Sequence, residues 1–375
     1  MNTAKLLELG QSPWLDNIER HHTRSGELNR MVEQEGLRGL TSNPSIFDKS
    51  ISKGQGYEPD IRRLAGQGMT AIELYESLTT TDIREAAQVL LPVHETSAGR
   101  DGYVSLEPPS QYAYDIEKTI AEASRLFRLV NAPNLMMKVP GTADGLVALR
   151  RLVGSGINVN VTLLFSPHNY ALAAQAYIDG LSDLMAQGGD LTRIASVASV
   201  FVSRVDTLVD KQLEQRAAAE TNLVRRHETE RLRGRAALAN CELIYHIYRQ
   251  RFSAPDFQAL AASGARPQRL LWGSTSTKNP AYSDLKYVEG LVAQGTINTL
   301  PLETWKALLD HGAIRYSLGY DQDGARATLD RIEDLGINMD EAHATLQREG
   351  VAAFDRALDS LLCNLEEKRK QAVVR

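Results

Sequence analysis

Short apolar runs alternate along most of the chain with longer stretches that carry apolar residues at helical spacing. Runs of a few mostly apolar residues, bounded by turn-forming residues, are typical of buried parallel strands. Eight such runs start near residues 14, 37, 102, 135, 157, 194, 268 and 297. A helical pattern separates each consecutive pair; after the third run, for example, Ile116, Ile120 and Ala123 recur on one helical face. This alternation predicts an α/β protein with a parallel sheet.

Eight strand–helix units are the order expected of an eightfold β/α barrel of the TIM type, in which the strands end on one rim. A doubly wound open sheet is the alternative. We also expect a helical insertion near residues 207–263 and a C-terminal helical extension over residues 320–375. The extension has an apolar stripe of Val351, Phe354, Leu358, Leu361 and Leu365. The prediction is one domain over residues 1–375, with the barrel in 1–319 and additions that serve packing more than chemistry.

Composition narrows the class of protein. With 43% hydrophobic and 24% charged residues, the 375-residue chain has the balance of an ordinary globular protein. The formal charge of −5 argues against a general nucleic-acid binder, and the arginines between residues 225 and 235 alternate with glutamates, as on a solvated helix face. We expect no signal peptide and no membrane span. Cys241 and Cys363 form no C-x-x-C motif, which favours a reduced, cytoplasmic setting. A monomer or homodimer is expected.

One lysine stands out in the fourth predicted strand. Residues 135–139 are apolar except for Lys138, and Pro140, Gly141 and Thr142 follow as a loop into a helix. Burial disfavours the ammonium form of such a side chain and makes the free amine available as a nucleophile. An ammonium group that reaches out to solvent at the strand end is the alternative.

Polar residues at the other strand ends supply what an amine nucleophile needs. Carbinolamine and imine formation require proton transfer, and so does cleavage of a carbon–carbon bond. Glu107 lies one strand before Lys138 and Thr162 one strand after it, so a water held by Glu107 is predicted to shuttle protons. Asp16, from across the barrel, is predicted to act on the bond that breaks. The amides and hydroxyl suited to a sugar-like substrate are Asn43, Asn160 and Ser199.

The chain has neither a P-loop nor a dinucleotide fingerprint, so these two motifs do not supply a phosphate site. We instead predict phosphate binding by a pair of cations. Arg204 and Lys278 follow late strands, where barrels often bind phosphate. The histidines lack metal-ligand spacing, so no metal is predicted.

Each candidate also has a structural explanation. Asp16 and Asn43 are residue types that cap helices and shape loops, and Glu107 precedes two prolines. Asn160 and Thr162 would suit inward-facing polar positions of a barrel. Arg204 and Lys278 would suit surface ion pairs. The joint occurrence of these groups at successive strand ends favours a catalytic site.

Four segments resemble transaldolases and come in the order found in that family. They are residues 41–45 (TSNPS), 104–107 (VSLE), 137–142 (MKVPGT) and 157–166 (INVNVTLLFS). The resemblance runs from about Trp14 to about Leu308. The lengths of the insertion and the tail are similar to those of a longer bacterial branch of the family.

The resemblance implies an eightfold barrel that uses a Schiff-base lysine without metal or organic cofactor. Lys138 would form the imine with a ketose phosphate, such as sedoheptulose 7-phosphate or fructose 6-phosphate, and Asp16 would deprotonate the hydroxyl next to the scissile bond. The other implied roles are water positioning by Glu107 and Thr162, binding of the dihydroxyacetone unit by Asn43, Asn160 and Ser199, a wall at Phe201, and phosphate binding by Arg204, Lys278 and Ser276.

One position departs from the family pattern. Many members have arginine where this chain has Lys278, and a lysine is a point charge rather than a planar fork, so weaker phosphate binding is expected. Two rival functions stay open at this stage. One is an aldolase that releases free dihydroxyacetone, and the other is a non-catalytic barrel that binds sugar phosphates.

Overall fold

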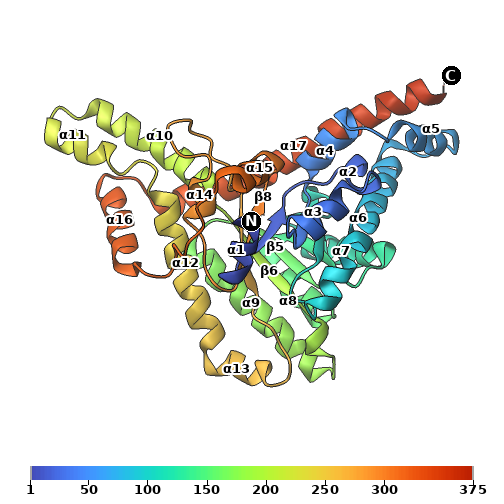
Figure 1. The fold of residues 1–375 in the computed structure, drawn as a ribbon, viewed down its shortest axis with the longest axis horizontal. Helices are drawn as coiled ribbons and strands as arrows, with labels where there is room; N and C mark the ends of the chain where they lie inside the picture. The colour runs from blue at the N-terminus through green and yellow to red at the C-terminus, as the bar shows by residue number, and fades with distance from the viewer. Residues whose placement is uncertain (1, 374–375) are drawn as a thin grey trace.

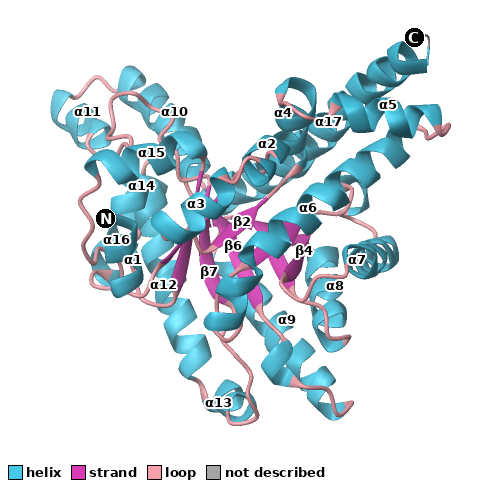
Figure 2. Cartoon of the chain, turned by 45° about the vertical axis from the view of Figure 1, so that its right-hand side comes forward, coloured by secondary structure: helices cyan, strands magenta, loops and turns pink. Residues whose placement is uncertain are grey.

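The computed structural model describes residues 2–373, in which eight parallel strands form a closed barrel with helices around it (Figure 1). The strands are β1 Ser12–Leu15, β2 Gly39–Thr41, β3 Tyr103–Leu106, β4 Leu135–Pro140, β5 Val159–Leu164, β6 Ser196–Phe201, β7 Arg269–Gly273 and β8 Thr296–Leu300. They pair in chain order, and β1 closes the barrel by pairing with β8. Figure 2 shows the strands at the centre, enclosed by helices. The predicted barrel is confirmed, and the open sheet is wrong.

Helices connect the strands, form the predicted insertion (α10 to α13) and make up the C-terminal extension. Their bounds are α1 Asn2–Glu8, α2 Arg20–Arg24, α3 Glu27–Gln34, α4 Pro44–Lys53, α5 Glu58–Gly66, α6 Ala71–Thr96, α7 Ile116–Val130, α8 Ala143–Gly154, α9 Pro167–Ala186, α10 Ser203–Ala219, α11 Leu223–Glu230, α12 Ala236–Ser253, α13 Pro255–Ala261, α14 Lys286–Glu289, α15 Leu302–His311, α16 Gln322–Asp334 and α17 Met339–Val373. Short 3₁₀ turns cover Ser110–Tyr112 and Leu191–Arg193. Within residues 2–373, no helix has the length and apolar character needed to cross a membrane.

The second strand begins later than the apolar pattern predicts. Leu37 lies in the turn that follows α3, where its N–H donates to the carbonyl of Met31 at 3.1 Å. The strand itself starts at Gly39, which lies against the ring of Trp14. A Cβ at residue 39 would come within 2.4 Å of that ring, so only glycine fits here.

After three of the strands, the N-cap residue of the next helix follows within two residues of the strand end. Asn43, Thr142 and Ser166 each accept a hydrogen bond from the backbone N–H three residues later, at 3.0 Å. Pro44 and Pro167 occupy the first helical positions after two of these caps. The connections after β2, β4 and β5 are therefore short and well defined, which fixes the positions of side chains at these strand ends.

The barrel interior changes from apolar to polar along the strands. Met136 and Ile297 belong to a buried cluster inside the barrel that also contains Trp14, Tyr103, Ala195, Val197 and Leu271. Side chains two residues apart on a strand point to the same face, so Lys138 and Thr299 extend inward one step further along. The apolar cluster thus supports a polar floor at the carboxyl ends of the strands, where the chemistry of such barrels takes place.

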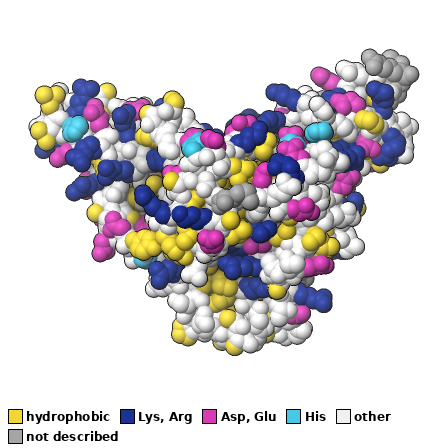
Figure 3. All heavy atoms as spheres, in the orientation of Figure 1, with side chains coloured by type: hydrophobic (Ala, Val, Ile, Leu, Met, Phe, Trp, Pro, Cys, Tyr) yellow, Lys and Arg dark blue, Asp and Glu magenta, His cyan; other side chains and the backbone are white. Residues whose placement is uncertain are grey.

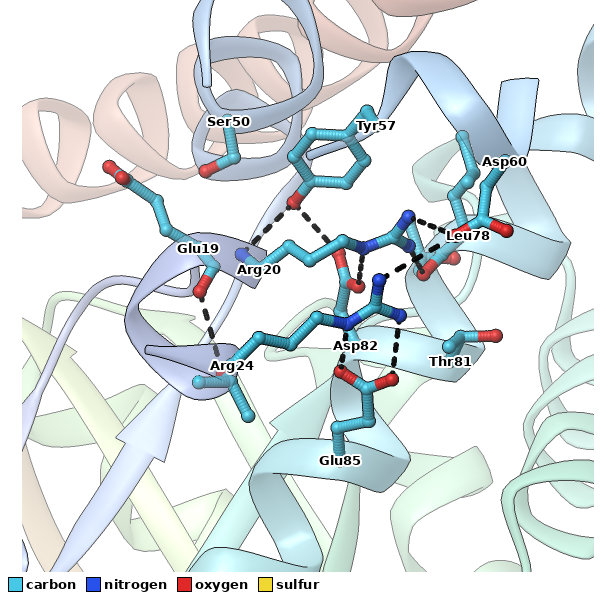
Figure 4. Close-up of polar contacts among 12 residues, drawn as sticks. Glu19, Arg20, Arg24, Ser50, Tyr57, Asp60, Leu78, Thr81, Asp82 and Glu85 are labelled. Carbon is cyan, nitrogen blue, oxygen red and sulfur yellow. Dashed lines mark hydrogen bonds and ion pairs between the residues drawn. The ribbon is translucent and has the colours of Figure 1, made fainter. Parts of the chain in front are cut away.

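A buried ionic network holds the connection that follows β1 (Figure 4). Arg20, whose side chain is 1% exposed, lies 2.7 Å from Asp82 and 2.8 Å from Asp60. The hydroxyl of Tyr57 donates to the other oxygen of Asp82 at 2.8 Å. These contacts fasten the start of α2 to α5 and α6, and so fix the chain just after Asp16.

The C-terminal helix α17 lies against the rim of the barrel and continues past α4 to α5 (Figure 1). Near its start, the amide of Gln347 donates to the carbonyls of Gly141 at 2.8 Å and Leu163 at 3.2 Å. Gly350 brings the helix close to Leu163, since a Cβ at residue 350 would lie 2.7 Å from that side chain. Further along, Asn364 donates to Asp48 of α4 at 3.2 Å. The predicted helical extension is confirmed and is docked at both ends.

Seen as in Figure 1, the molecular surface is hollowed between two projecting parts (Figure 3). One part contains α10 and α11, and the other contains α5 and the end of α17. Acidic and basic side chains are interspersed over both parts. This mixture agrees with the solvated face predicted for the arginine-rich segment of the insertion.

One buried histidine on α17 is expected to make stability depend on pH. Burial lowers the pKa of His343 to about 4, against an ordinary value of 6.5. The unfolded chain therefore takes up this proton at a higher pH than the folded chain. The free energy of unfolding therefore receives its full contribution from neutral His343 above pH 6.5. This contribution, on the order of 3 kcal/mol, is lost as the pH falls toward 4. We expect His343→Leu to flatten the free energy of unfolding over this range, measured by urea denaturation at several pH values. An unchanged slope would contradict the assignment.

Candidate active site

Lys138 lies inside the barrel at the end of β4, where its side chain is 5% exposed. Its Nζ donates to the carbonyl of Ser42 at 3.0 Å and lies 3.1 Å from Oε2 of Glu107. Burial raises the pKa of Glu107, and the positive charge of Lys138 opposes that rise. The carboxyl of Glu107 is thus close enough to Nζ to exchange protons with groups bound at that nitrogen. The alternative of a lysine that reaches solvent is wrong, because the amine is held within the barrel.

Asp16 follows β1 and is held by residues of two neighbouring strands. The hydroxyl of Thr41 donates to Asp16 at 2.7 Å and lies 2.7 Å from the hydroxyl of Thr299. Burial raises the pKa of Asp16, while the Thr41 hydrogen bond and the charges of Lys138 and Lys278 oppose the rise. A carboxylate whose pKa is raised is a stronger base than an ordinary carboxylate, which suits a group that must accept a proton and later return it.

Most of the predicted site residues surround one cavity of about 160 Å³. Its lining includes Asp16, Asn43, Lys138, Thr162, Ser199, Phe201, Arg204, Ser276 and Lys278. The lining also includes Thr41 and Thr299, which sequence analysis did not single out. Thr41 was visible as a polar residue at the end of a predicted strand, within a segment that carried the family resemblance. Thr299 lies in a strand whose apolar pattern gave no separate signal.

Two of the predicted residues lie beside this cavity rather than on its wall. Asn160 is fully buried, accepts a hydrogen bond from Ser199 at 2.6 Å, and donates to Ser105 at 3.0 Å. It therefore orients Ser199, which does line the cavity. Glu107 lines a second, smaller cavity, which Lys138 also lines.

Two residues have further hydrogen-bonding capacity. The side-chain oxygen of Asn43 is used as the cap of α4, so its amide nitrogen is the group available to the cavity. The hydroxyl of Thr162 is buried and has no hydrogen-bond partner among residues 2–373. Buried hydroxyl groups normally have a hydrogen-bond partner. The Thr162 hydroxyl is therefore suited to bind a water molecule or a ligand.

Two cations gather at the rim of the main cavity. Nζ of Lys278 donates to Ser276 at 2.6 Å, and the guanidinium of Arg204 lies 5.4 Å from the centre of the Phe201 ring. Burial lowers the pKa of Lys278, and the charge of Arg204 lowers it further. Neither cation forms an ion pair with a carboxylate in the described part of the chain, contrary to the surface-pair explanation. Two neighbouring cations without a directly paired carboxylate suit an anionic ligand such as phosphate.

The C-terminal helix also reaches the site. Phe354 of α17 is 3% exposed and lines both cavities, and Nζ of Lys138 lies 5.7 Å from the centre of its ring. The expectation that the extension serves packing more than chemistry is therefore incomplete. In the sequence, Phe354 was one member of an apolar stripe, which gave no sign that it would differ from the others.

Comparison with known proteins identifies the family. Residues 13–365 match the family model described as Transaldolase/Fructose-6-phosphate aldolase. The chain belongs to this family. A protein named transaldolase from Thiobacillus denitrificans is 46% identical over 97% of this chain and 100% of its own length. Transaldolases from Trichodesmium erythraeum and Saccharopolyspora erythraea are 42% and 43% identical, each over 99% of this chain and over 99% and 98% of their own lengths.

Membership of the transaldolase family makes this chain an enzyme of the transferase class. The match extends well into α17, so the helix that supplies Phe354 is part of the family domain as the model defines it. The predicted family resemblance, which was placed between about Trp14 and Leu308, is confirmed over a longer range.

Proposed function

We propose that this enzyme transfers a dihydroxyacetone unit between sugar phosphates through a Schiff base on Lys138. The donor is a ketose phosphate, either sedoheptulose 7-phosphate or fructose 6-phosphate, and the acceptor is an aldose phosphate, either glyceraldehyde 3-phosphate or erythrose 4-phosphate. The reaction belongs to the pentose phosphate pathway in the cytoplasm, without metal or organic cofactor. The observation that carries the proposal is a buried amine that faces a cavity lined by Asp16 and by two cations, Arg204 and Lys278.

Imine formation begins with attack of the Lys138 amine on the ketose carbonyl. The carbinolamine then loses water, for which its hydroxyl must gain a proton and its nitrogen must lose one. Glu107, at 3.1 Å from Nζ and with a raised pKa, suits both transfers. The unpaired hydroxyl of Thr162 suits the positioning of the water.

Cleavage of the carbon–carbon bond requires a base on the neighbouring hydroxyl. Asp16 takes that proton, the aldose phosphate leaves, and the bonding electrons move into the imine to give an enamine. Asp16 lies across the cavity from the lysine strand, held by Thr41. When an acceptor aldehyde arrives, the same carboxyl returns the proton as the new bond forms.

Phosphate binding orders the substrate in the cavity. Arg204 and Lys278 hold the phosphate, with Ser276 assisting, while Asn43 and Ser199 contact the dihydroxyacetone unit. Asn160 acts through Ser199 in this arrangement. The matched family model covers aldolases as well, so release of free dihydroxyacetone is the second candidate function.

Asp16→Asn separates the two stages of the proposed reaction. We expect transfer from fructose 6-phosphate to erythrose 4-phosphate to fall roughly 10²-fold or more, because the base for bond cleavage is lost. Imine formation at Lys138 should persist, since Glu107 is unchanged. The measurement combines a coupled transfer assay with borohydride reduction and mass spectrometry of the lysine adduct. Transfer at the wild-type rate would refute the role of Asp16, and loss of the adduct would show that Asp16 acts earlier.

A further inference from the structure

Phe354 separates two cavities that meet at Lys138. The main cavity contains Asp16 and the two cations, and the smaller one contains Glu107. Among residues 2–373, only Lys138 and Phe354 line both cavities. The ring is therefore placed over the amine on which the intermediate would form, and it is itself 3% exposed.

The position of this ring is fixed by the way α17 docks. Gln347 is hydrogen-bonded to the ends of β4 and β5, and Gly350 allows close approach to Leu163. Phe354 lies one helical turn beyond Gly350, on the same face of the helix. Docking of α17 thus places the Phe354 ring at the mouth of the barrel, where the ring covers Lys138.

An enamine on Lys138 has two fates, and they differ in whether water is used. Its nucleophilic carbon can bond to the carbonyl carbon of an aldose phosphate, whose oxygen then takes the proton held by Asp16. Alternatively, the same carbon takes a proton, and water adds to the resulting iminium carbon. The carbon–nitrogen bond then breaks, which releases dihydroxyacetone and restores the amine. The second route consumes one water molecule, which balances the water released during imine formation, so it needs no other reactant.

We propose that Phe354 decides between these fates by keeping water from the enamine until an acceptor binds. The inference rests on the proposed function, because it concerns an intermediate of that reaction. An apolar ring over the amine offers no hydrogen bond to water and fills space that water would otherwise enter. Phe354 is thus a specificity-determining residue, supplied by the C-terminal helix, that favours transfer over release.

The test measures free dihydroxyacetone relative to transferred dihydroxyacetone, with fructose 6-phosphate as donor and erythrose 4-phosphate as acceptor. This ratio does not depend on how much of a variant is folded. Phe354→Ala should raise it roughly tenfold or more, within the selectivity that one apolar contact supplies. Phe354→Leu keeps an apolar group over the amine and should stay near the wild type. Phe354→Val should give a ratio between those of the alanine and leucine variants. It serves as the test if the alanine variant does not fold.

Leu361→Ala is the matched control. Leu361 is a fully buried apolar residue of α17 that lines neither cavity, so its loss weakens helix docking without opening the site. Its ratio should equal that of the wild type. An unchanged ratio in both Phe354→Ala and Phe354→Val, or an equal rise in Leu361→Ala, would overturn the inference. If the wild type gave neither transfer nor a borohydride adduct at Lys138, the proposed function itself would fail instead.

Discussion

Lys138→Met is expected to abolish the covalent intermediate and to lower transfer by about 10⁴-fold or more, because no other group supplies the nucleophile. The substitution keeps the length and apolar stem of the side chain, so the surrounding barrel has little reason to change. Loss of the lysine charge would also raise the pKa of Glu107 further, because that charge opposes the effect of burial. The measurement is borohydride reduction in the presence of fructose 6-phosphate, followed by mass spectrometry, together with the transfer assay.

Lys278→Met provides the control for this experiment. It also removes a lysine that lines the main cavity, but at the proposed phosphate end. We expect a raised KM, with the reduced adduct still on Lys138 at high substrate concentration. An adduct on a lysine other than Lys138, or substantial transfer by Lys138→Met, would refute the role of Lys138 as the nucleophile.

Arg20→Met is expected to destabilise the fold by about 3–5 kcal/mol, the usual effect of removing one partner from a buried ion pair. Asp82 would stay buried with only the hydroxyl of Tyr57 as a donor from this network. Because burial already raises the pKa of Asp82, loss of the guanidinium would favour its protonated form. The effect is measured as the shift in the urea midpoint of unfolding, with the wild type under the same conditions.

Arg24→Met is the matched comparison. Arg24 belongs to the same cluster, but its side chain is 46% exposed where it pairs with Glu85 (Figure 4). Exposed pairs contribute about 0.2–1 kcal/mol, so the urea midpoint should move little. Equal shifts for the two arginine variants would show that burial does not set the importance of the network.

The barrel was predictable because each of its units leaves a local trace in the sequence. Strands buried on both faces read as apolar runs, and Asn43, Thr142 and Ser166 mark helix starts with their own side chains. Lys138 was predictable for the same reason, as a charged residue within an apolar strand. Such features depend on neighbours in the chain, and neighbours in the chain are what a sequence displays.

What could not be predicted depends on contacts between distant segments. Thr41 meets Asp16 and Thr299 only after the barrel has closed. Phe354 and Leu361 belong to one apolar stripe, yet the first covers a catalytic cavity and the second does not. Helical spacing shows which residues share a face, but it does not show what that face meets. The ionic network around Arg20 was likewise not anticipated, since its partners come from helices far along the chain.

Closure of the barrel through β1 and β8 has a consequence for synthesis of the protein. The first strand is made early but pairs on one side with Thr296–Leu300, so that edge stays open until most of the chain exists. Open strand edges favour pairing with other chains, and such long-range contacts form slowly. The helix α17 is made after all eight strands of the barrel, and its Asn364 docks onto α4, which is made early. A nascent chain is therefore exposed to misassembly until α17 is complete, and the active site acquires its cover after the barrel strands have been made.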